Sequence, residues 1–284
     1  MGATTSGRRV SARNRAAPSV PAAGEAERED AGGEAVGTPA LLPGATIGRY
    51  GCPVDLDLLQ TLRSTGAARE FHPEPVDDEV LARLLDTARF APSGGNRQGW
   101  RVIVVQDPAA RTALRDLYLR GWYEYLAMGF AGLVPWAPVT DRAAEAEAIA
   151  GAAPFAEAGA AAPGFAETLD TAPALLLVLA DLSALAAVDR DLPRYTFAGG
   201  ASIYPFVWSL LLAARTEGLG GVMTTMPVRQ EDEVRALFGI PSTVAVAALV
   251  VLGRPVTVPS RLRRAPVHSF AWVDRFEGTP IAGP

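Results

Sequence analysis

Residues 174–179 read ALLLVL, an unbroken apolar run in the second half of the chain. This run is too short for a membrane-spanning helix, which needs about 18 apolar residues or more. A short, continuous apolar segment is typical of a strand that is buried on both faces. We therefore expect a sheet that contains this strand and has further apolar elements packed against it.

Helical and strand patterns alternate around this run. The apolar residues of 203–214 recur at helical spacing, and they make the strongest helical stripe in the sequence. Weaker helical patterns occur at 79–90, 113–126 and 231–238, and short strand patterns at 102–105 and 244–252. These elements do not form a series of compact βαβ repeats, so we expect an α+β sandwich with helices flanking one sheet.

The chain divides into a tail and one ordered domain. Residues 1–48 are rich in Ala, Gly, Pro, Arg and Glu, a composition that buries too little apolar surface to fold, so we expect a disordered tail. The domain is expected to occupy 49–284. Inside it, 128–163 is rich in Ala, Gly and Pro with little pattern, which predicts a lid or an irregular insertion.

Composition excludes several classes of function. The net charge of −5 argues against a nucleic-acid surface. A single cysteine allows no disulfide framework within one chain, and one cysteine with two histidines disfavours a metal site. The histidines also supply no Ser-His-Asp set. We therefore expect His72 and His268 at structural or surface positions. A G-x-G-x-x-G after a strand is missing, which argues against a Rossmann dinucleotide site. We expect a cytoplasmic protein that binds neither membrane nor nucleic acid.

Several motifs follow one another in a recognisable order. They are REFHPEPV at 69–76, APSGGNRQGW at 91–100, LDTAP at 169–173, the glycine-threonine stretch within 212–227, GRP at 253–255 and RLRR at 261–264. In this order they resemble the nitroreductase family, over roughly residues 60–275. The second motif is the most specific, because its Ala-Pro-Ser-x-x-Asn-x-Gln-x-Trp pattern rarely arises by chance.

The resemblance implies a nitroreductase-like sandwich with a central, mainly antiparallel sheet, a homodimer, and flavin mononucleotide (FMN) as cofactor. It implies hydride transfer from NADH or NADPH through the flavin to a small acceptor, such as a nitro compound or a quinone, by a ping-pong mechanism. The alternatives are a reductive dehalogenase, an ene-type reductase, an enzyme that cleaves the flavin itself, and a non-catalytic flavin-storage protein. Residues 256–284 are expected to form a C-terminal extension.

The resemblance also assigns candidate residues, because FMN needs cations at its phosphate, adaptable polar groups along the ribityl chain and backbone donors near the ring. The expected cofactor contacts are Arg63, Gly66, Arg69, Pro92, Ser93, Gly94, Asn96, Gln98, Thr224, Thr225, Met226, Arg263 and Arg264. The expected substrate contacts are Gly95, Trp122 and Tyr123. No metal ligand and no catalytic side chain is expected, because the flavin supplies the chemistry.

The same residues have plainer explanations. The family has Arg-Arg-Ser-x-Arg where this chain has TGAAR at 65–69, so two Arg and the Ser of that pattern are missing here, and Arg69 suits a surface salt bridge. Asn96 suits the capping of its own turn. Thr224 and Thr225 suit the edge of a strand, and the aromatic residues near Trp122 suit a hydrophobic core.

Overall fold

The apolar run forms an inner strand of a four-stranded sheet in the computed structural model, which describes residues 58–257 and 262–283. The strand order is β1-β2-β4-β3. The strands are β1 (Trp100–Val104), β2 (Ala174–Asp181), β3 (Gly220–Thr224) and β4 (Val244–Gly253). All three strand pairings are antiparallel, so the expected α+β fold with an antiparallel sheet is confirmed.

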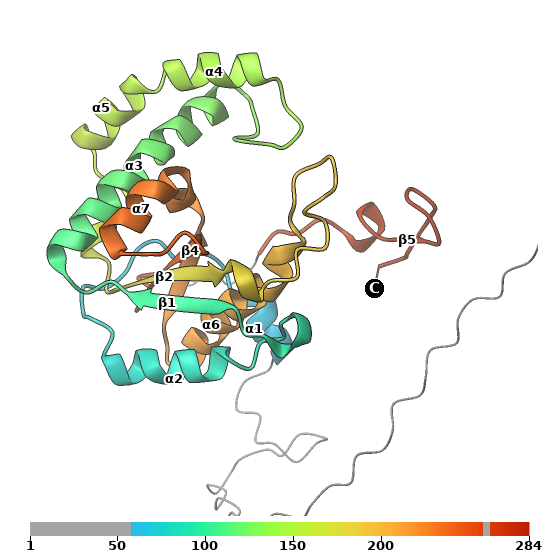
Figure 1. Cartoon of the computed structure of the whole chain (residues 1–284), viewed down its shortest axis with the longest axis horizontal. Helices are drawn as coiled ribbons and strands as arrows, with labels where there is room; N and C mark the ends of the chain where they lie inside the picture. Colours follow the sequence, from blue (N-terminus) through green and yellow to red (C-terminus); the bar gives the residue numbers. More distant parts are fainter. Residues whose placement is uncertain (1–57, 258–261, 284) are drawn as a thin grey trace, which may run out of the picture. The chain divides into compact units, whose positions relative to one another are not determined.

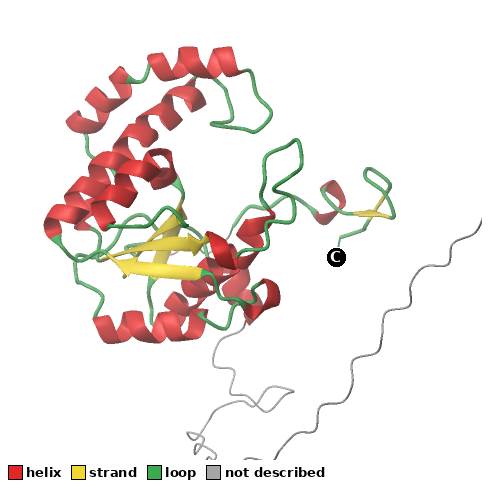
Figure 2. Ribbon diagram, viewed as in Figure 1, coloured by secondary structure: helices red, strands yellow, loops and turns green. Residues whose placement is uncertain are grey.

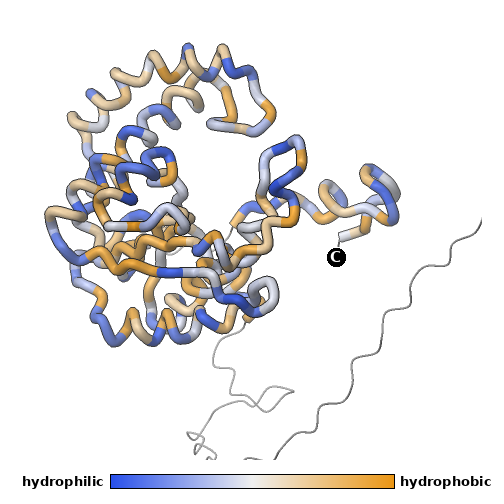
Figure 3. The backbone as a smooth tube through the Cα atoms, in the orientation of Figure 1, coloured by the Kyte–Doolittle hydropathy of each residue, from blue (hydrophilic) through white to orange (hydrophobic). Residues whose placement is uncertain are grey.

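Both faces of β2 are buried, because alternate side chains enter two separate cores. Leu176 and Val178 belong to one core with α2 (Asp78–Ala88) and α6 (Tyr204–Thr216). Leu175 and Leu177 belong to the other, with α3 (Pro108–Phe130) and α7 (Glu231–Phe238). All four side chains have no exposed surface. Figure 1 shows these helix pairs on opposite sides of the sheet, and Figure 3 shows the apolar character of the strands between them.

A bulge in β4 changes which face its residues occupy. The register shifts so that Val178 lies opposite Ala248 and Leu179 opposite Val246, which leaves Ala247 as an extra residue. Ala248 therefore enters the α2–α6 core and Val246 the α3–α7 core. The carboxylate of Glu231, at the start of α7, accepts a hydrogen bond of 2.6 Å from the Val246 N–H. The bulge is thus fastened to the helix that covers it.

The segment before α2 runs along the outer edge of β3. The Ala68 N–H donates to the Gly221 carbonyl at 3.0 Å, and further on the His72 N–H donates to the Arg254 carbonyl at 2.9 Å. This close approach requires glycine in the sheet. A Cβ at Gly220 would lie 3.2 Å from the Ala68 Cβ, and one at Gly253 would lie 2.9 Å from the Phe71 ring. Arg69 is thereby placed beside the edge strand.

Residues 128–163 differ from the expected lack of pattern. Figure 2 shows helices there: α3 extends to Phe130, and α4 (Arg142–Ala150) and α5 (Ala153–Ala161) follow. The prediction of irregular structure was wrong. The Gly and Pro residues favoured it, but the segment also contains many alanines, which are the strongest helix formers. Asp141 caps α4 by accepting hydrogen bonds from the N–H groups of Ala143 and Ala144.

The remaining described elements are short. α1 (Leu58–Ser64) precedes the segment beside β3. Residues 262–283 contain the small antiparallel pair β5 (Trp272–Val273) and β6 (Thr279–Pro280). The expected tail at 1–48 and the expected start of order near Arg49 lie outside the described residues. Among the helices of the described ranges, none is both long and apolar enough to cross a membrane.

The two-sided burial of β2 gives a stability prediction. Leu177→Ala should lower the free energy of unfolding by about 2–5 kcal/mol, because it leaves a cavity in a core that cannot fully collapse. Leu182→Ala, at a residue that is 50% exposed just after the same strand, should change it by no more than about 0.5 kcal/mol. Urea denaturation of the two variants checks this, and equal losses would contradict the burial described for β2.

Candidate functional site

Two groups of candidate residues lie at different edges of the sheet. Arg69 and Thr224 lie on or beside β3, which is one edge strand, whereas the loop of residues 92–98 leads into β1, which is the other. Strands β2 and β4 separate the edges, so β1 and β3 are about 14 Å apart, at three spacings of about 4.8 Å. Within one chain, the structure does not bring the two groups together.

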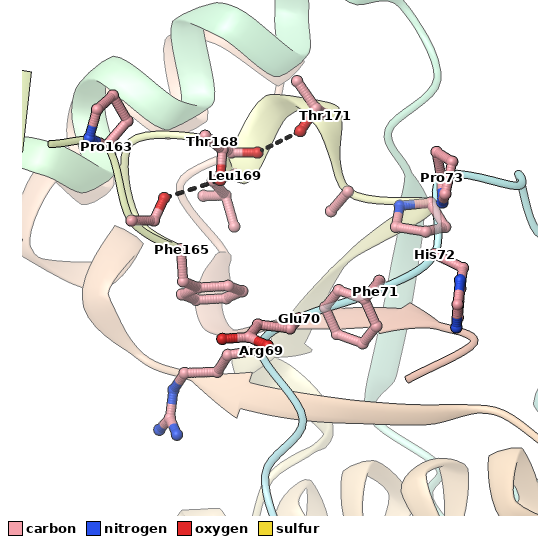
Figure 4. A pocket seen from close by; sticks show the side chains of 13 residues that line it. Arg69, Glu70, Phe71, His72, Pro73, Pro163, Phe165, Thr168, Leu169 and Thr171 are labelled. Carbon is pink, nitrogen blue, oxygen red and sulfur yellow. Dashed lines mark hydrogen bonds between the residues drawn. The ribbon is translucent and has the colours of Figure 1, made fainter. Parts of the chain in front are cut away.

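Arg69 is exposed, and its guanidinium forms no ion pair or hydrogen bond with any other described residue. Arg69 lines a cavity of about 430 Å³ together with Thr168 and Thr171, and in Figure 4 its side chain extends away from these two threonines. The plainer alternative of a surface salt bridge is therefore not realised among the described residues. An unpartnered guanidinium at the edge of a sheet is available to an anionic ligand.

The hydroxyl of Thr224 is the next polar group along this edge. Its Oγ1 accepts from the Met226 N–H at 3.3 Å and lies 3.4 Å from the hydroxyl of Tyr118 on α3. Tyr118 is buried, and this burial raises the pKa of its phenol, although the hydrogen bond to Thr224 and the nearby charge of Arg69 act in the opposite direction. Arg69, Tyr118 and Thr224 thus form one polar group at the β3 edge.

The two residues after Thr224 differ in their surroundings. Thr225 is exposed at the end of the strand, whereas Met226 is buried and packs into the α3–α7 core. The side chain of Met226 is therefore a core residue, and a contact with a ligand here would have to come from its backbone. Thr224 is the last residue of the edge strand β3, as the plainer alternative held, and Thr225 directly follows it.

The loop of residues 92–98 is held in an uncommon backbone conformation. Gly95, Asn96 and Gln98 all have positive φ angles, of 62°, 52° and 50°. Glycine adopts this region freely and asparagine more readily than most residues, whereas glutamine is strained there. Backbone strain of this kind concentrates at functional sites.

The loop's own polar groups support that conformation. Ser93 Oγ accepts from the Gln98 N–H at 3.0 Å, and the Gln98 side-chain amide lies 3.3 Å from Asn96 Oδ1. Asn96 and Ser93 therefore stabilise their own turn, as the plainer explanation expected. Pro92, Gly94 and Asn96 are nevertheless exposed, so they remain accessible to a ligand or to another chain.

A second loop, 182–203, supports the first from behind. Ser202 Oγ accepts from the Gly94 N–H at 3.0 Å. The buried Asp189 carboxylate fixes the loop by accepting from the Thr196 hydroxyl at 2.6 Å, from the Phe197 N–H at 2.9 Å and from Arg194 at 2.9 Å. These hydrogen bonds, the one from Thr196 first, hold the pKa of Asp189 well below its usual range. A lone Asp such as this one has no local signature in the sequence.

The same loop borders an apolar cavity. The cavity has a volume of about 1010 Å³ and lies between Pro138 and Val139 of the segment before α4 and residues 192–197. Tyr195 and Phe197 provide its aromatic wall, and their side chains are 61% and 75% exposed. Arg142, at the start of α4, hydrogen-bonds to the Tyr195 hydroxyl and so joins the two walls.

The aromatic substrate candidates on α3 lie on different faces of the helix. Trp122 stacks on Tyr125, with ring centroids 5.4 Å apart, and packs against the α3–α7 core. Tyr123 faces α5 instead, where its hydroxyl lies 2.8 Å from the position of a Cβ built on Gly159. The structure therefore places Trp122 and Tyr123 on different faces of α3, and their contact with a substrate stays a prediction.

The remaining candidates are less closely defined. Arg63 is exposed at the end of α1, and Gly66 follows it in the segment leading to Arg69. Arg263 and Arg264 are exposed, and the guanidinium of Arg264 donates to the Arg263 carbonyl at 2.8 Å. Their roles stay predictions. No group of three or more His, Cys, Asp or Glu suited to a metal ion occurs within the described ranges.

Comparison with known proteins decides the family. The model of the nitroreductase family matches residues 62–254. This chain belongs to the nitroreductase family. A Thermus thermophilus protein named NADH dehydrogenase is 30% identical over 200 residues, which are 70% of this chain and 87% of that protein.

Solved structures agree with the fold. A BluB-like flavoprotein from Clostridium difficile superposes with a TM-score of 0.55 at 18% identity, covering 76% of this chain and 98% of that one. The NADPH:FMN oxidoreductase from Vibrio harveyi, solved with NAD⁺, gives 0.51 at 21% identity, covering 77% of each chain. At this level of identity, these structures establish the nitroreductase fold.

The buried Asp189 gives a prediction about pH. Its folded-state pKa is lowered, so its contribution to stability is present above the unfolded pKa of about 3.9 and is lost as the pH falls through the folded value. Asp189→Asn should therefore lower the Tm by a constant amount from pH 8 to 6, and the gap to wild type should narrow below about pH 4. Asp191→Asn, at an exposed ion pair, is the control and should leave the Tm unchanged. A gap that widens on acidification would contradict the assignment.

Proposed function

We propose that this protein is an FMN-dependent oxidoreductase that takes hydride from NADH or NADPH and passes it, by a ping-pong mechanism, to a small acceptor such as a nitro compound or a quinone. Family membership and the NADH dehydrogenase relative support flavin-dependent NAD(P)H oxidoreduction in general. The Vibrio harveyi protein that shares the fold is named an NADPH:FMN oxidoreductase, which agrees with the proposed use of FMN and a nicotinamide.

The observation that carries the proposal is the Arg69 guanidinium, which has no partner among the described residues and lies beside the open edge of β3. In the described residues, the outer side of β3 is bridged only at Gly221, so the edge from Val222 to Thr224 has no neighbouring strand. A phosphate suits Arg69, and a flat ring suits an edge that ends in two threonines. The residues present therefore fit FMN, with Arg69 at the phosphate and 222–226 beside the ring.

When bound, FMN supplies the hydride chemistry, so the chain needs no acid or base of its own. Its residues would bind and orient. Arg69 would hold the phosphate, and backbone N–H groups near Thr224 and Thr225 would favour the negative charge that develops on reduction. Arg263 and Arg264 are proposed as further phosphate contacts, with Arg63 and Gly66 as lesser ones.

We propose that the active form is a homodimer in which the 92–98 loop of one copy completes the FMN site of the other. The loop lies at the sheet edge opposite to Arg69, and the two groups do not come together within one copy, so we infer that a second copy supplies the loop. Apolar side chains on neighbouring helices support an interface: Leu58 and Leu62 of α1 are 61% and 40% exposed, and Trp208 of α6 is 41% exposed. Large apolar residues exposed together are typical of interaction surfaces.

The acceptor is proposed to be an uncharged aromatic compound, because of the apolar cavity beside loop 182–203. Its volume is close to the upper end of the range of small-molecule sites, about 1,000 Å³. Its charged neighbours are already neutralised, since Arg194 pairs with Asp189 and Arg142 with Glu145. A quinone or a nitroaromatic fits this chemistry better than an anion does.

The role of Arg69 is tested by its removal. Arg69→Ala should weaken FMN binding about 10- to 100-fold, because a charge-assisted hydrogen bond to phosphate contributes about 1.5–3 kcal/mol. Arg190→Ala, which removes an exposed guanidinium paired with Asp191, is the matched control and should leave binding unchanged. Fluorescence titration of the apoprotein with FMN measures both. Equal affinity of the two variants would rule out Arg69 as the phosphate contact.

Turnover is tested separately by anaerobic addition of NADH or NADPH to the FMN-loaded protein. The flavin absorbance should bleach and then return on addition of a quinone, as ping-pong transfer requires. Tyr195→Ala and Phe197→Ala should slow the return with a quinone more than with ferricyanide, which has no aromatic ring to bind. If neither nicotinamide bleaches the flavin, the protein is a flavin-storage protein or uses another reductant.

A further inference from the structure

Helix α3 packs closely against the turn that follows β3. The Tyr118 side chain, only 2% exposed, extends from the helix so that its hydroxyl lies 3.4 Å from Thr224 Oγ1. Thr224 Oγ1 in turn accepts from the Met226 N–H at 3.3 Å. One phenol on α3 is therefore connected, through a single hydroxyl, to the backbone of the turn that we place beside the flavin.

Gly121 lies one turn further along the same face of α3. A Cβ built on it would lie 2.9 Å from Met226 Sδ and 3.3 Å from both Cβ and Cγ of Arg229. Glycine inside a helix costs about 1 kcal/mol relative to alanine. Here it leaves room for the Arg229 Cβ, which a methyl group would displace from the helix by a few tenths of an ångström.

The other end of the turn is fastened independently. Glu231, which directly follows the turn, accepts the 2.6 Å hydrogen bond from the Val246 N–H at the β4 bulge. Residues 224–231 are therefore held between α3 on one side and the bulge of β4 on the other. The position of Thr224 and Thr225 depends on how closely α3 can approach.

We propose that Tyr118 and Gly121 are positioning residues that set the place of residues 224–226 relative to the flavin. The inference rests on the proposed function. Hydrogen-bond donors stabilise developing charge only when their geometry is held to within about 0.5 Å. If a methyl group pushes the turn outward, the protein binds FMN less tightly and stabilises the reduced flavin less.

The chain offers a matched pair of variants for the test. Gly121→Ala adds a methyl group against Met226, whereas Gly129→Ala adds one on the same helix with nothing within 4 Å. We expect Gly121→Ala to weaken FMN binding at least about 10-fold and to make the flavin reduction potential at full occupancy more negative, as loss of a well-placed donor requires. Gly129→Ala should match wild type in both measurements.

Tyr118→Phe removes only the hydroxyl and keeps the ring in the core. It should weaken FMN binding about 2- to 5-fold, the effect of one neutral hydrogen bond, and shift the potential in the same direction. The potential separates positioning from general destabilisation, because loss of stability alone does not change it once the site is full. If Gly121→Ala does not fold, Tyr118→Phe decides the question.

Two outcomes overturn the inference, and they differ. If wild-type protein takes up no FMN, the proposed function fails and this inference fails with it. If wild type binds FMN, but Gly121→Ala and Tyr118→Phe match Gly129→Ala in affinity and potential, only the positioning role is wrong.

Discussion

The burial of both faces of β2 and β4 is the constraint on which the rest of this structure depends. The side chains of Leu175 to Val178 and of Ala248 to Leu252 have no exposed surface, and helices cover each side. A sheet covered in this way leaves only its edges and the ends of its strands open to a ligand. The candidate residues accordingly lie along the edge of β3 and in the loop that leads into β1.

The same packing determines how well that edge can be ordered. Helix α3 covers one core and, through Tyr118 and Gly121, also contacts the turn after β3. The β4 bulge redirects Val246 into this core and offers its N–H to Glu231. Because the α3–α7 core and the turn after β3 share these residues, changes in packing on the α3 side reach the turn directly.

Sequence patterns were sufficient for the fold because the inner strand is an unbroken apolar run and α6 has a strong apolar stripe, with weaker helical patterns at α2, α3 and α7. They were insufficient for 128–163, where helix formation depends on alanine content and on the Asp141 cap. They also missed Tyr118, Gly121 and Asp189, whose partners lie far away in the sequence. A glycine inside a helical pattern was the one local signal available for Gly121, since it indicates close packing against a neighbour. The motifs did find Arg69 and the 92–98 loop, but not that they lie at opposite edges of the sheet.

The central claim is that one FMN site takes Arg69 from one copy and the 92–98 loop from another, and subunit mixing tests it most directly. Arg69→Glu and Asn96→Asp should each abolish FMN binding on their own. Refolded together in equal amounts, half of the dimers should be mixed, and each mixed dimer has one unaltered site, so about a quarter of the wild-type sites should return. The regained sites, counted by equilibrium dialysis, should have wild-type affinity. No recovery from a mixture that does form mixed dimers would show that both residues act in the same copy, and the account would be wrong.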